Sequence, residues 1–474
     1  MSAPALKRSA VLSFGLSGLA NNLVGTAIGV HLLMFYTDIV GLAPLWVSAG
    51  LVIASIWDAI SDVAMGRLSD GTRWRAGRRR PYILIGLVPA GLAFIALLSP
   101  PALQGPWLGL YFVGTLLVLF SAKTIVQVPA LSLLPEMAKG YDDRTKLATA
   151  RELLGNVGDL LGLMLPPAFL ILLQVDETSP DAAAGAREAF FWAAVVGGCV
   201  IIGTLLATYL GTSEDRATRP EPTDLRNAFR TLRNNRPFRT LLTASALAAL
   251  GLAFVNALVL YVMVHVLQLE SPVWHMAAFA VNASAAILSY PFWGWLTKKR
   301  GKPFAFRVGL GLSMFTFVSV FFVGPGNLIG LFAVMVFGGA SNVGFWMLMH
   351  ALSADVTDVD ELASGERREG LFAGFSALLR KGAVAAALGL VGVGLWFIGY
   401  RAGAPSQTAE TIFGLKLLFA VPPSVLLLCA LFVFRRFDLT REAHAEVAKA
   451  LASRKEAVVH ALPQADETRF VEAA

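Results

Sequence analysis

The chain has 474 residues, of which 56% are apolar and 15% are charged, and its formal net charge is +7. Soluble proteins carry about 25% charged residues, so the composition excludes a soluble enzyme and a disordered chain. An outer-membrane barrel is excluded because its strands would alternate in polarity. The two cysteines lie inside apolar runs and offer no disulfide framework. We therefore expect a polytopic membrane protein whose helices each need about 20 apolar residues.

Twelve apolar windows follow one another along the chain, six on each side of a polar stretch. The predicted spans lie near residues 10–36, 45–70, 82–99, 107–135, 147–174, 189–211, 240–268, 273–297, 304–324, 327–354, 370–399 and 411–435. The pattern predicts an all-α fold with two six-helix bundles (1–212 and 240–436), a central cytoplasmic loop (213–239) and a tail (437–474). Within the tail, residues 440–459 predict an amphipathic surface helix. No cleavable signal peptide is expected.

Basic residues concentrate in alternate connections between the predicted spans. They are Arg73, Arg75, Arg78, Arg79 and Arg80, then Arg216, Arg219, Arg226, Arg230, Arg233, Arg236 and Arg239, then Lys298, Lys299, Arg300 and Lys302, and finally Arg367 and Arg368. The connections on the opposite side carry only Arg187 and Arg401. Since basic loops stay in the cytoplasm, we expect both termini on the cytoplasmic side of the cell (inner) membrane.

A weak internal repeat accompanies these basic turns. Residues Met65–Tyr82 after the second span and Trp293–Phe304 after the eighth each contain glycine, leucine, a basic turn and a proline. Two matched halves favour a secondary transporter with a midplane site over a receptor or a membrane enzyme. The sequence contains no phosphate-binding glycine loop and no nucleophile elbow, so ATP-driven transport and hydrolysis lack support.

Charged residues inside predicted spans are functional candidates, because burying an ionised group in the bilayer is costly. Asp58 and Asp62 are four residues apart, so their carboxylates share one helix face, beside Ser61. Such converging oxygens suit Na⁺, Li⁺ or a proton. The alternative is a structural pair that a base on a neighbouring helix satisfies. The histidines have no zinc-like spacing, so no metal site is expected.

Further polar residues lie in four other spans. They are Lys123 and Thr124 in the fourth span, Arg151, Glu152 and Asp159 in the fifth, Trp346 in the tenth, and Arg380 and Lys381 in the eleventh. Before any family comparison, Trp346 is more simply explained by packing, and Arg380 by a position near a helix end.

Five segments resemble one family in their order and spacing. They are FYTDIVGL (Phe35–Leu42), IWDAISDVAMG (Ile56–Gly66), GRRRPYILIG (Gly77–Gly86), VPALSLLPEM (Val128–Met137) and ADVTDVDELASGERREGLFAG (Ala354–Gly374). The chain resembles the glycoside–pentoside–hexuronide cation symporters, the melibiose permease group of the major facilitator superfamily. The resemblance implies the major facilitator fold, with twelve transmembrane helices in two halves, and no cofactor beyond the coupling ion, Na⁺ or H⁺.

The resemblance also implies roles for individual residues. The coupling cation would bind at Asp58, Asp62, Ser61 and Thr124. The solute would contact Asn22, Gln127, Arg151, Trp346 and Lys381, and a cytoplasmic gate would comprise Asp355, Asp358 and Arg367. Asn22 and Gln127 stand where the melibiose permease has two sugar-binding aspartates. Amides still form hydrogen bonds with hydroxyls, but galactoside specificity does not transfer. Glu152 and Asp159 are extra acids that could replace the lost polarity.

Lys123 departs from the family pattern and is a candidate modulator of the cation site. An ammonium near Asp58 and Asp62 would neutralise one carboxylate, so coupling would be to protons or weak. The alternative is that Lys123 points away from the pair, since adjacent helical residues diverge by about 100°.

These features predict a cation-coupled symporter that works by alternating access, with a small solute, such as a sugar, and a monovalent cation as its partners in the bilayer. No nucleic-acid partner and no enzymatic activity are expected, and the family implies a monomer. One alternative is a non-sugar amphiphile, such as a lysolipid, on the same scaffold. A proton-coupled or uncoupled carrier is another alternative. A non-transporting sensor is disfavoured because the carboxylate pair is intact and the tail is short.

Overall fold

The computed structural model describes residues 7–72, 74, 77–138, 141–175, 181–214, 235–269, 271–364, 369–404 and 406–461. The elements are α1 (Arg8–Thr26), η1 (Ala27–Leu32), η2 (Phe35–Val40), α2 (Pro44–Gly71), α3 (Arg80–Leu97), α4 (Pro106–Ser132), α5 (Leu134–Met137), α6 (Tyr141–Leu172), α7 (Ala182–Gly211), α9 (Arg236–Tyr261), η3 (Val262–Val266), α10 (Pro272–Arg300), α11 (Lys302–Ser319), η4 (Val320–Phe322), α12 (Leu328–Ser364), α13 (Glu369–Phe397), α14 (Ala409–Phe434) and α15 (Arg441–Ala461). Within these residues, twelve helices are long and apolar enough to cross a membrane. The predicted number and order of spans are confirmed.

Proline and glycine mark the ends of many spans. Proline occupies the first or second position of α2, α3, α4, α9, α10 and α11, where its missing N–H costs nothing. Gly41 ends the first span with a φ of +87°, a conformation that favours glycine. Beyond the bundle, α15 confirms the helix predicted in the tail.

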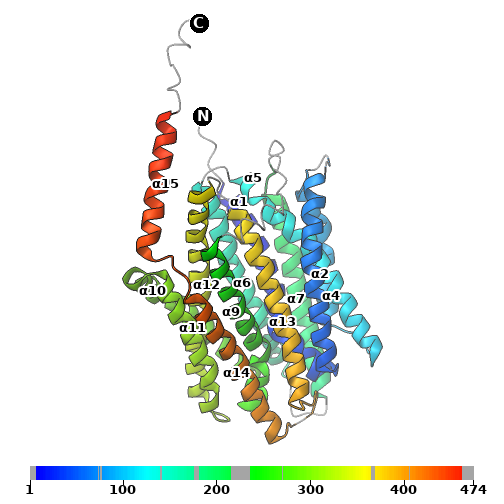
Figure 1. The fold of residues 1–474 in the computed structure, drawn as a ribbon. Coiled ribbons are helices and arrows are strands. Elements are labelled where there is room, and N and C mark those ends of the chain that lie inside the picture. The colour runs from blue at the N-terminus through cyan, green and yellow to red at the C-terminus, as the bar shows by residue number, and fades with distance from the viewer. Residues whose placement is uncertain are drawn as a thin grey trace.

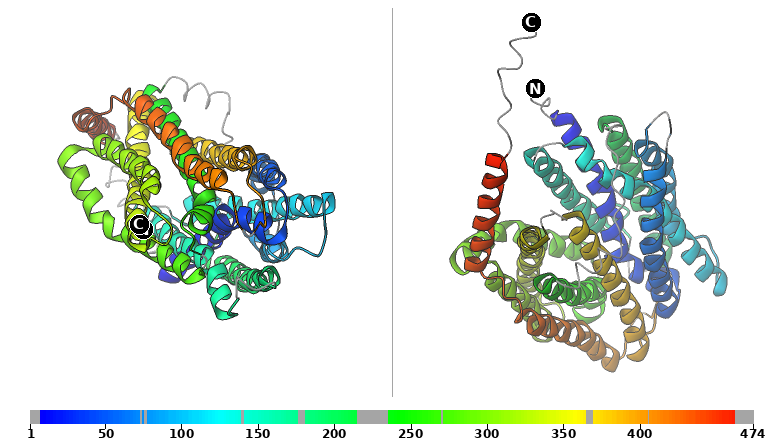
Figure 2. Two further views of the ribbon diagram at one scale, coloured as in Figure 1. Left: turned by 90° about the horizontal axis from the view of Figure 1, so that it is seen from below. Right: turned by 45° about the horizontal axis from the view of Figure 1, so that its top comes forward.

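We call α1–α7 the first half and α9–α14 the second half. Figure 2 shows the blue-to-teal helices of the first half gathered on one side and the green-to-orange helices of the second half on the other. The end of the bundle that carries α5 and α15, at the top of Figure 1, is called the basic face. The turn after α2 and the turn between α10 and α11 also lie at this face. The other end is called the opposite face.

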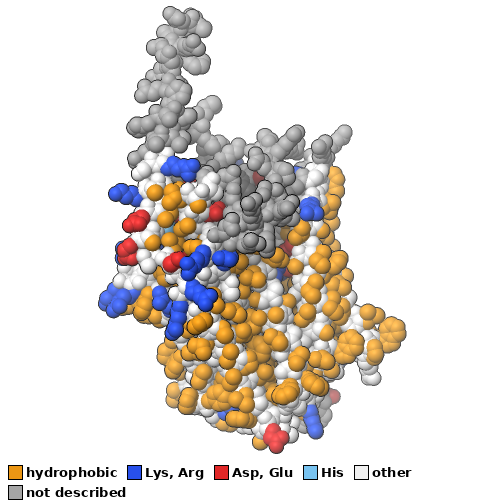
Figure 3. All heavy atoms as spheres, in the orientation of Figure 1, with side chains coloured by type: hydrophobic (Ala, Val, Ile, Leu, Met, Phe, Trp, Pro, Cys, Tyr) orange, Lys and Arg blue, Asp and Glu red, His pale blue; other side chains and the backbone are white. Residues whose placement is uncertain are grey.

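An apolar surface surrounds the bundle between the two faces. Figure 3 shows hydrophobic side chains over the middle and lower parts of the molecule, with Lys and Arg gathered toward the basic face. Phe322, Phe397 and Leu288 are 84%, 83% and 77% exposed. A water-soluble protein would bury such side chains, whereas lipid tails solvate them. The protein is therefore a multi-pass integral membrane protein.

Glycines bring α1 and α6 into close contact. A Cβ added at Gly18 would lie 2.3 Å from the carbonyl oxygen of Arg151, and one at Gly158 would lie 2.2 Å from that of Leu19. Small residues permit this approach, which is the usual means of packing helices in lipid. The contact holds Asn22 of α1 beside Asp159 of α6 in the interior of the first half.

Two spans are interrupted by π-helical turns that hydrophobic periodicity did not predict. In the first span, η1 and η2 follow α1, and in the seventh span η3 follows α9. A π turn inserts an extra residue per turn, and it rotates the side chains that follow. Thr37 and Asp38 lie on η2, and His265 lies on η3. These three side chains therefore face directions that a regular α-helix would not give them.

Candidate functional site

The carboxylates of α2 meet α4 and α13 at a partly buried cluster. Asp58, which is 4% exposed, accepts a hydrogen bond from Thr124 Oγ1 at 3.3 Å, and Asp62 accepts one from the same hydroxyl at 2.9 Å. The Ser61 hydroxyl lies 3.1 Å from that of Thr124. The four predicted cation-site residues thus lie together. Their carboxylate and hydroxyl oxygens form a donor set that suits a small hard cation.

A lysine from the second half reaches both carboxylates. The ammonium of Lys381 on α13 lies 2.5 Å from Asp58 Oδ2 and also pairs with Asp62 Oδ2. Family roles assigned Lys381 to the solute cavity, whereas its ammonium lies against the cation-site carboxylates. Lys381 is therefore in the position of the neighbouring base that the sequence analysis gave as the alternative to a cation site. This ion-pair cluster links the two halves at the centre of the bundle.

Lys123 does not pair with these carboxylates within the described part of the chain. Its ammonium lies 5.4 Å from the centre of the Phe120 ring on the same helix, a cation–π geometry. The charges of Asp58, Asp62 and Lys381 still act on it. Of the two alternatives that the sequence left open, the described contacts fit the one in which Lys123 makes no ion pair with Asp58 or Asp62.

The predicted solute-contacting residues lie in several separate environments. Asn22 donates to Asp159 Oδ2 at 3.0 Å, and the Thr26 hydroxyl donates to Asp159 Oδ1 at 2.5 Å. Asp159 thus supplies a carboxylate directly beside the position where the family has its span-one acid. Gln127 donates to the backbone oxygen of Ser17 at 3.0 Å, and its own side-chain oxygen is buried without a described partner.

Two arginines and the predicted solute-contacting tryptophan have a different set of neighbours. Arg151 Nη1 is 3.9 Å from Glu152 Oε1, too far for a hydrogen bond. The Trp346 ring centre is 5.6 Å from the guanidinium carbon of Arg380 and 6.3 Å from the ring centre of His350. Sequence reasoning gave Arg380 no role, because a residue beside Lys381 on a helix is not marked by spacing alone.

Two of the three predicted gate residues, Asp355 and Asp358, lie in one polar cluster. Lys302 Nζ lies 2.6 Å from Asp355 Oδ1, so the second copy of the repeat places a base against an acid of α12. His444 of α15 lies 3.1 Å from Asp358 Oδ2 and 3.5 Å from Asp355 Oδ1. The tail helix is therefore docked on this cluster. Arg367, the third predicted member, lies outside the described residues.

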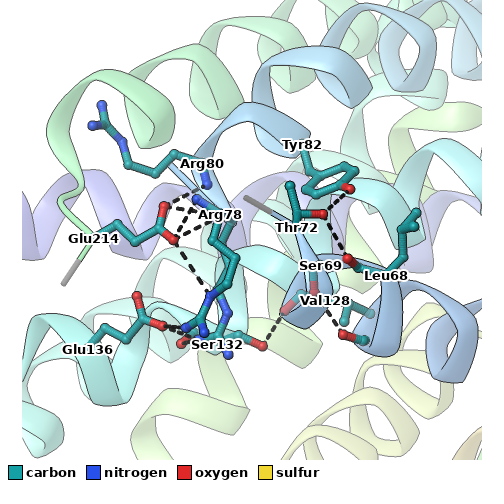
Figure 4. Close-up of polar contacts among 12 residues, drawn as sticks. Leu68, Ser69, Thr72, Arg78, Arg80, Tyr82, Val128, Ser132, Glu136 and Glu214 are labelled. Atoms are coloured by element: carbon teal, nitrogen blue, oxygen red, sulfur yellow. Dashed lines mark hydrogen bonds and ion pairs between the residues drawn. The ribbon is translucent and has the colours of Figure 1, made fainter. Parts of the chain in front are cut away.

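The first copy of the repeat is held by a carboxylate from the end of the first half. Glu214 accepts the backbone N–H groups of Arg78 at 2.8 Å, Arg79 at 3.1 Å and Arg80 at 3.4 Å (Figure 4). It thereby caps the start of α3, whose free N–H groups favour an anion. Gly77 has a φ of +118°, and a Cβ there would lie 2.5 Å from Glu214 Oε2, so only glycine fits.

A second carboxylate, Glu136 of α5, binds the side chains of the same turn. Arg79 Nη1 lies 2.6 Å from Glu136 Oε1, and the Arg78 guanidinium contacts the same oxygen. Burial raises the pKa of the Glu136 carboxyl, while the charges of Arg79 and Arg78 oppose that rise. The turn after α2 is thus fixed to α5 and to the end of α7 at the basic face.

A polar network that sequence reasoning missed joins the halves at the opposite face. The Tyr400 hydroxyl donates to Asp38 Oδ1 at 2.6 Å and lies 2.8 Å from His265 Nε2. The Thr37 hydroxyl lies 2.8 Å from that of Tyr261. We call these five residues the opposite-face network. Burial, reinforced by the Asp38 charge, raises the pKa of Tyr400, so the phenol stays protonated and able to donate.

Phenylalanine at position 400 is expected to loosen this closure. Tyr400→Phe removes a hydrogen bond to a charged group, worth about 2 kcal/mol, or about 30-fold in the ratio of closed to open states. Spin labels at Gln104 and Pro325, with Cys199 and Cys429 replaced by serine, would report a longer distance across the opposite face.

The matched control for that substitution is Tyr111→Phe. Its hydroxyl donates to the Ala96 carbonyl at 2.7 Å, within the first half only. The label distance should not change in this control. A Tyr400→Phe distance distribution identical to that of the unsubstituted protein would contradict a closing role for the network.

Twelve apolar spans around a central charged cluster define a transporter of the major facilitator type. The family model described as MFS/sugar transport protein matches residues 13–441, and the chain belongs to that family. The predicted membership of the major facilitator superfamily is confirmed.

Relatives of known sequence or structure cover almost the whole chain. The glucuronide carrier protein homolog of Escherichia coli is 26% identical and covers 94% of this chain and 95% of its own. The sodium-dependent lysophosphatidylcholine symporter 1 of Gallus gallus is 25% identical, and the match covers 94% of this chain and 89% of that protein. The solved structure of a bacterial homolog of the human lysosomal transporter Spinster shares the fold, with a TM-score of 0.64 and 13% identity. The match covers 95% of this chain and 99% of that one. The chain is a symporter-type membrane protein.

Proposed function

We propose that the protein couples the entry of a sugar or glycoside to that of a cation, Na⁺ or H⁺, by alternating access. The observation that carries this proposal is the cluster of Asp58, Asp62, Thr124 and Lys381. It offers oxygen ligands for a small cation, and it joins α2 and α4 of the first half to α13 of the second. A ligand bound there acts on both halves at once, which is what coupling requires.

The charges of the cluster suggest how coupling works. One Lys381 ammonium against two carboxylates leaves a charge of −1, which a single monovalent cation or proton would cancel. A cation held by Asp58 and Asp62 competes with Lys381, and it weakens the link between α2 and α13. By linkage, a solute that favours the new arrangement must raise cation affinity by the same factor.

The proposal includes placement in the cell membrane. The basic face, with the turns after α2 and α10, would lie in the cytoplasm, as would both termini. Residues 1–212 and 240–436 would then move as two bundles joined by the loop 213–239, with residues 437–474 as a tail, in a monomer. The opposite-face network would close the outer side in the conformation described here.

Uptake into proteoliposomes tests the proposed function. A panel of labelled glycosides, pentoses and hexuronates would be offered under an imposed Na⁺ gradient and, separately, a proton gradient. We expect accumulation of one class under one gradient, and its loss when the gradient is dissipated. Entry of every transported solute without accumulation would contradict symport.

A second candidate substrate is an amphiphile such as a lysolipid. Support comes from the relative named a lysophosphatidylcholine symporter and from a largely apolar pocket between α9, α12 and α13. Lysolipids therefore belong in the panel. Uptake of a lysolipid that sugars do not inhibit would favour this candidate over the first.

Lys123 is expected to tune the choice of cation. Its charge acts on Asp58 and Asp62 from outside ion-pair distance and disfavours a second cation there. Lys123→Ala should create or strengthen Na⁺ stimulation of uptake, by about fivefold if the charge contributes about 1 kcal/mol. The comparison is uptake with NaCl against choline chloride, with Lys416→Ala on α14 as control. Unchanged cation dependence of uptake in Lys123→Ala would contradict a role for Lys123 in the choice of cation.

A further inference from the structure

The second copy of the sequence repeat leaves three basic side chains exposed at the basic face. Lys298, Lys299 and Arg300 form the last turn of α10, and within the described residues no carboxylate pairs with them. In the first copy of the repeat, Glu136 and Glu214 bind the corresponding turn. The turn after α10 therefore keeps a positive charge that the protein neutralises in the other half.

A stripe of exposed apolar side chains leads along α10 to this charge. Its members follow one another at intervals of four, three and four residues, so they share one face of the helix: Leu288, Phe292, Trp295 and Lys299. The three apolar ones are 77%, 46% and 54% exposed. The Lys299 ammonium lies 4.9 Å from the centre of the Trp295 ring. This face of α10 is therefore an apolar track that ends in a cation.

The start of α11 and of α15 add cations beside the end of this track. The guanidinium carbon of Arg300 lies 5.7 Å from the centre of the exposed Phe304 ring on α11. Arg307, one turn further along α11, is exposed as well. Arg441 of α15 donates to the backbone oxygen of Lys298 at 3.0 Å. This contact brings a further guanidinium to the end of α10.

Five side chains make up what we call the α10 basic patch: Lys298, Lys299, Arg300, Arg307 and Arg441. Figure 3 shows Lys and Arg side chains gathered where α10, α11 and α15 meet. The carboxylate of Asp355 already pairs with Lys302 of the same turn. Asp438 and Glu442, the acids that flank Arg441 in sequence, are exposed. Five cations against these two acids leave an excess of positive charge.

We propose that the α10 basic patch binds the head group of an anionic phospholipid, whose acyl chains lie along the exposed face of α10. Lysine and arginine hold a phosphodiester by charge-assisted hydrogen bonds. Basic clusters next to a membrane span attract lipids of net negative charge. The continuity of the apolar stripe with Lys299 favours a lipid over a soluble phosphate, which would leave the stripe unused. The proposal does not depend on which solute the protein transports.

Native mass spectrometry of the purified full-length protein in detergent would measure the binding of single lipids. Phosphatidylglycerol carries a net negative charge, whereas phosphatidylcholine with the same acyl chains has a cation that compensates its phosphate. Glycerol 3-phosphate has the phosphate without acyl chains. We expect phosphatidylglycerol to bind at least tenfold more tightly than phosphatidylcholine. Glycerol 3-phosphate at the same concentration should not displace it.

Substitution of two cations of the patch tests its location. Each basic residue near an anionic lipid contributes a factor of about five, so the double variant Lys299→Gln, Arg300→Gln should lose at least tenfold in affinity for phosphatidylglycerol. Its affinity for phosphatidylcholine should not change. The matched control is Lys7→Gln, Arg8→Gln, because this pair is also adjacent and exposed, at the start of α1. The single variant Lys299→Gln, with a loss of about fivefold, tests the same site if the double variant does not fold.

A further variant tests the apolar stripe. Trp295→Ala removes an exposed ring from the proposed path of the acyl chains. It should weaken the binding of both lipids by the same factor, since the two lipids have the same chains. Unchanged binding of both lipids would contradict the placement of the chains along α10.

Three other results would overturn the proposal. Equal affinity for the two lipids would exclude a site that selects negative charge. An equal loss in both double variants would show that the whole basic face attracts the lipid and that the patch has no special part. Displacement of phosphatidylglycerol by an equal concentration of glycerol 3-phosphate would identify a soluble phosphate as the ligand.

Discussion

Replacing Asp58 or Asp62 by asparagine is expected to abolish uphill solute accumulation while leaving the protein folded in the membrane. Each variant loses one of two carboxylates that share Thr124 and Lys381, so a cation loses a charged ligand. The remaining carboxylate still pairs with Lys381, which preserves the link between α2 and α13. We expect the internal solute concentration to rise no higher than the external one, measured under the gradient that drives the unsubstituted protein.

Facilitated entry provides a second readout for these variants. If the carboxylates serve coupling alone, solute should still equilibrate down its own gradient in Asp58→Asn. Glu188→Gln, at an exposed acid of α7, controls for the loss of a negative charge. Full concentrative uptake by either aspartate variant would falsify the assigned role of the pair.

Removal of the Lys381 ammonium should make the protein dependent on Na⁺ for its stability. Lys381→Ala leaves two adjacent carboxylates without their base, and breaking such buried pairs costs about 3–5 kcal/mol. The lower value applies here, because the Lys381 and Asp62 side chains are 29% and 30% exposed. A cation at 100 times its Kd would restore about 2.7 kcal/mol. We expect thermal unfolding of the variant to shift upward by several degrees in Na⁺.

The measurement compares unfolding temperatures in NaCl and in choline chloride at equal ionic strength. Lys416→Ala removes a lysine from α14 and should respond equally to the two salts. If coupling is to protons, Lys381→Ala should be stabilised by a lower pH and not by Na⁺. Protonation of one carboxylate relieves the repulsion between Asp58 and Asp62. A variant as stable as the unsubstituted protein in choline chloride would contradict the neutralising role of Lys381.

The spans and their order were predictable because each one requires about 20 apolar residues and ends at proline, glycine or charge. The main difference lies in α12, which runs to Ser364, ten residues beyond the predicted end at 354. The additional turns carry Asp355 and Asp358, whose charges made the segment look like a loop. Their contacts with Lys302 and His444 stabilise helix there instead.

The cation site was predictable only in part. The four-residue spacing of Asp58 and Asp62 fixes one face of one helix. Whether Lys123 or Lys381 reaches that face depends on the rotation of α4 and α13, which spacing within a helix cannot give. Lys381 is 319 residues from Asp62 in sequence. Only the packing of the two halves shows that Lys381 is the base that contacts both carboxylates.

The opposite-face network shows why tertiary contacts escaped prediction. Thr37 and Asp38 lie in a segment that carries the family resemblance, but the direction of their side chains depends on the π turn η2. His265 similarly depends on η3, and Tyr400 lies in a turn after α13. π turns leave no periodic signal in a uniformly apolar segment. The contacts of Asp159 also depend on tertiary packing, because its partners Asn22 and Thr26 lie on another helix.

The most direct test of cation coupling is the entry of ions driven by solute alone. Proteoliposomes would receive an inward gradient of the transported solute with no ion gradient, and Na⁺ entry and internal pH would be recorded. We predict solute-dependent entry of Na⁺ or of protons in the unsubstituted protein and none in Asp58→Asn. Solute uptake without entry of either cation would contradict symport and leave Asp58, Asp62 and Lys381 as a structural cluster.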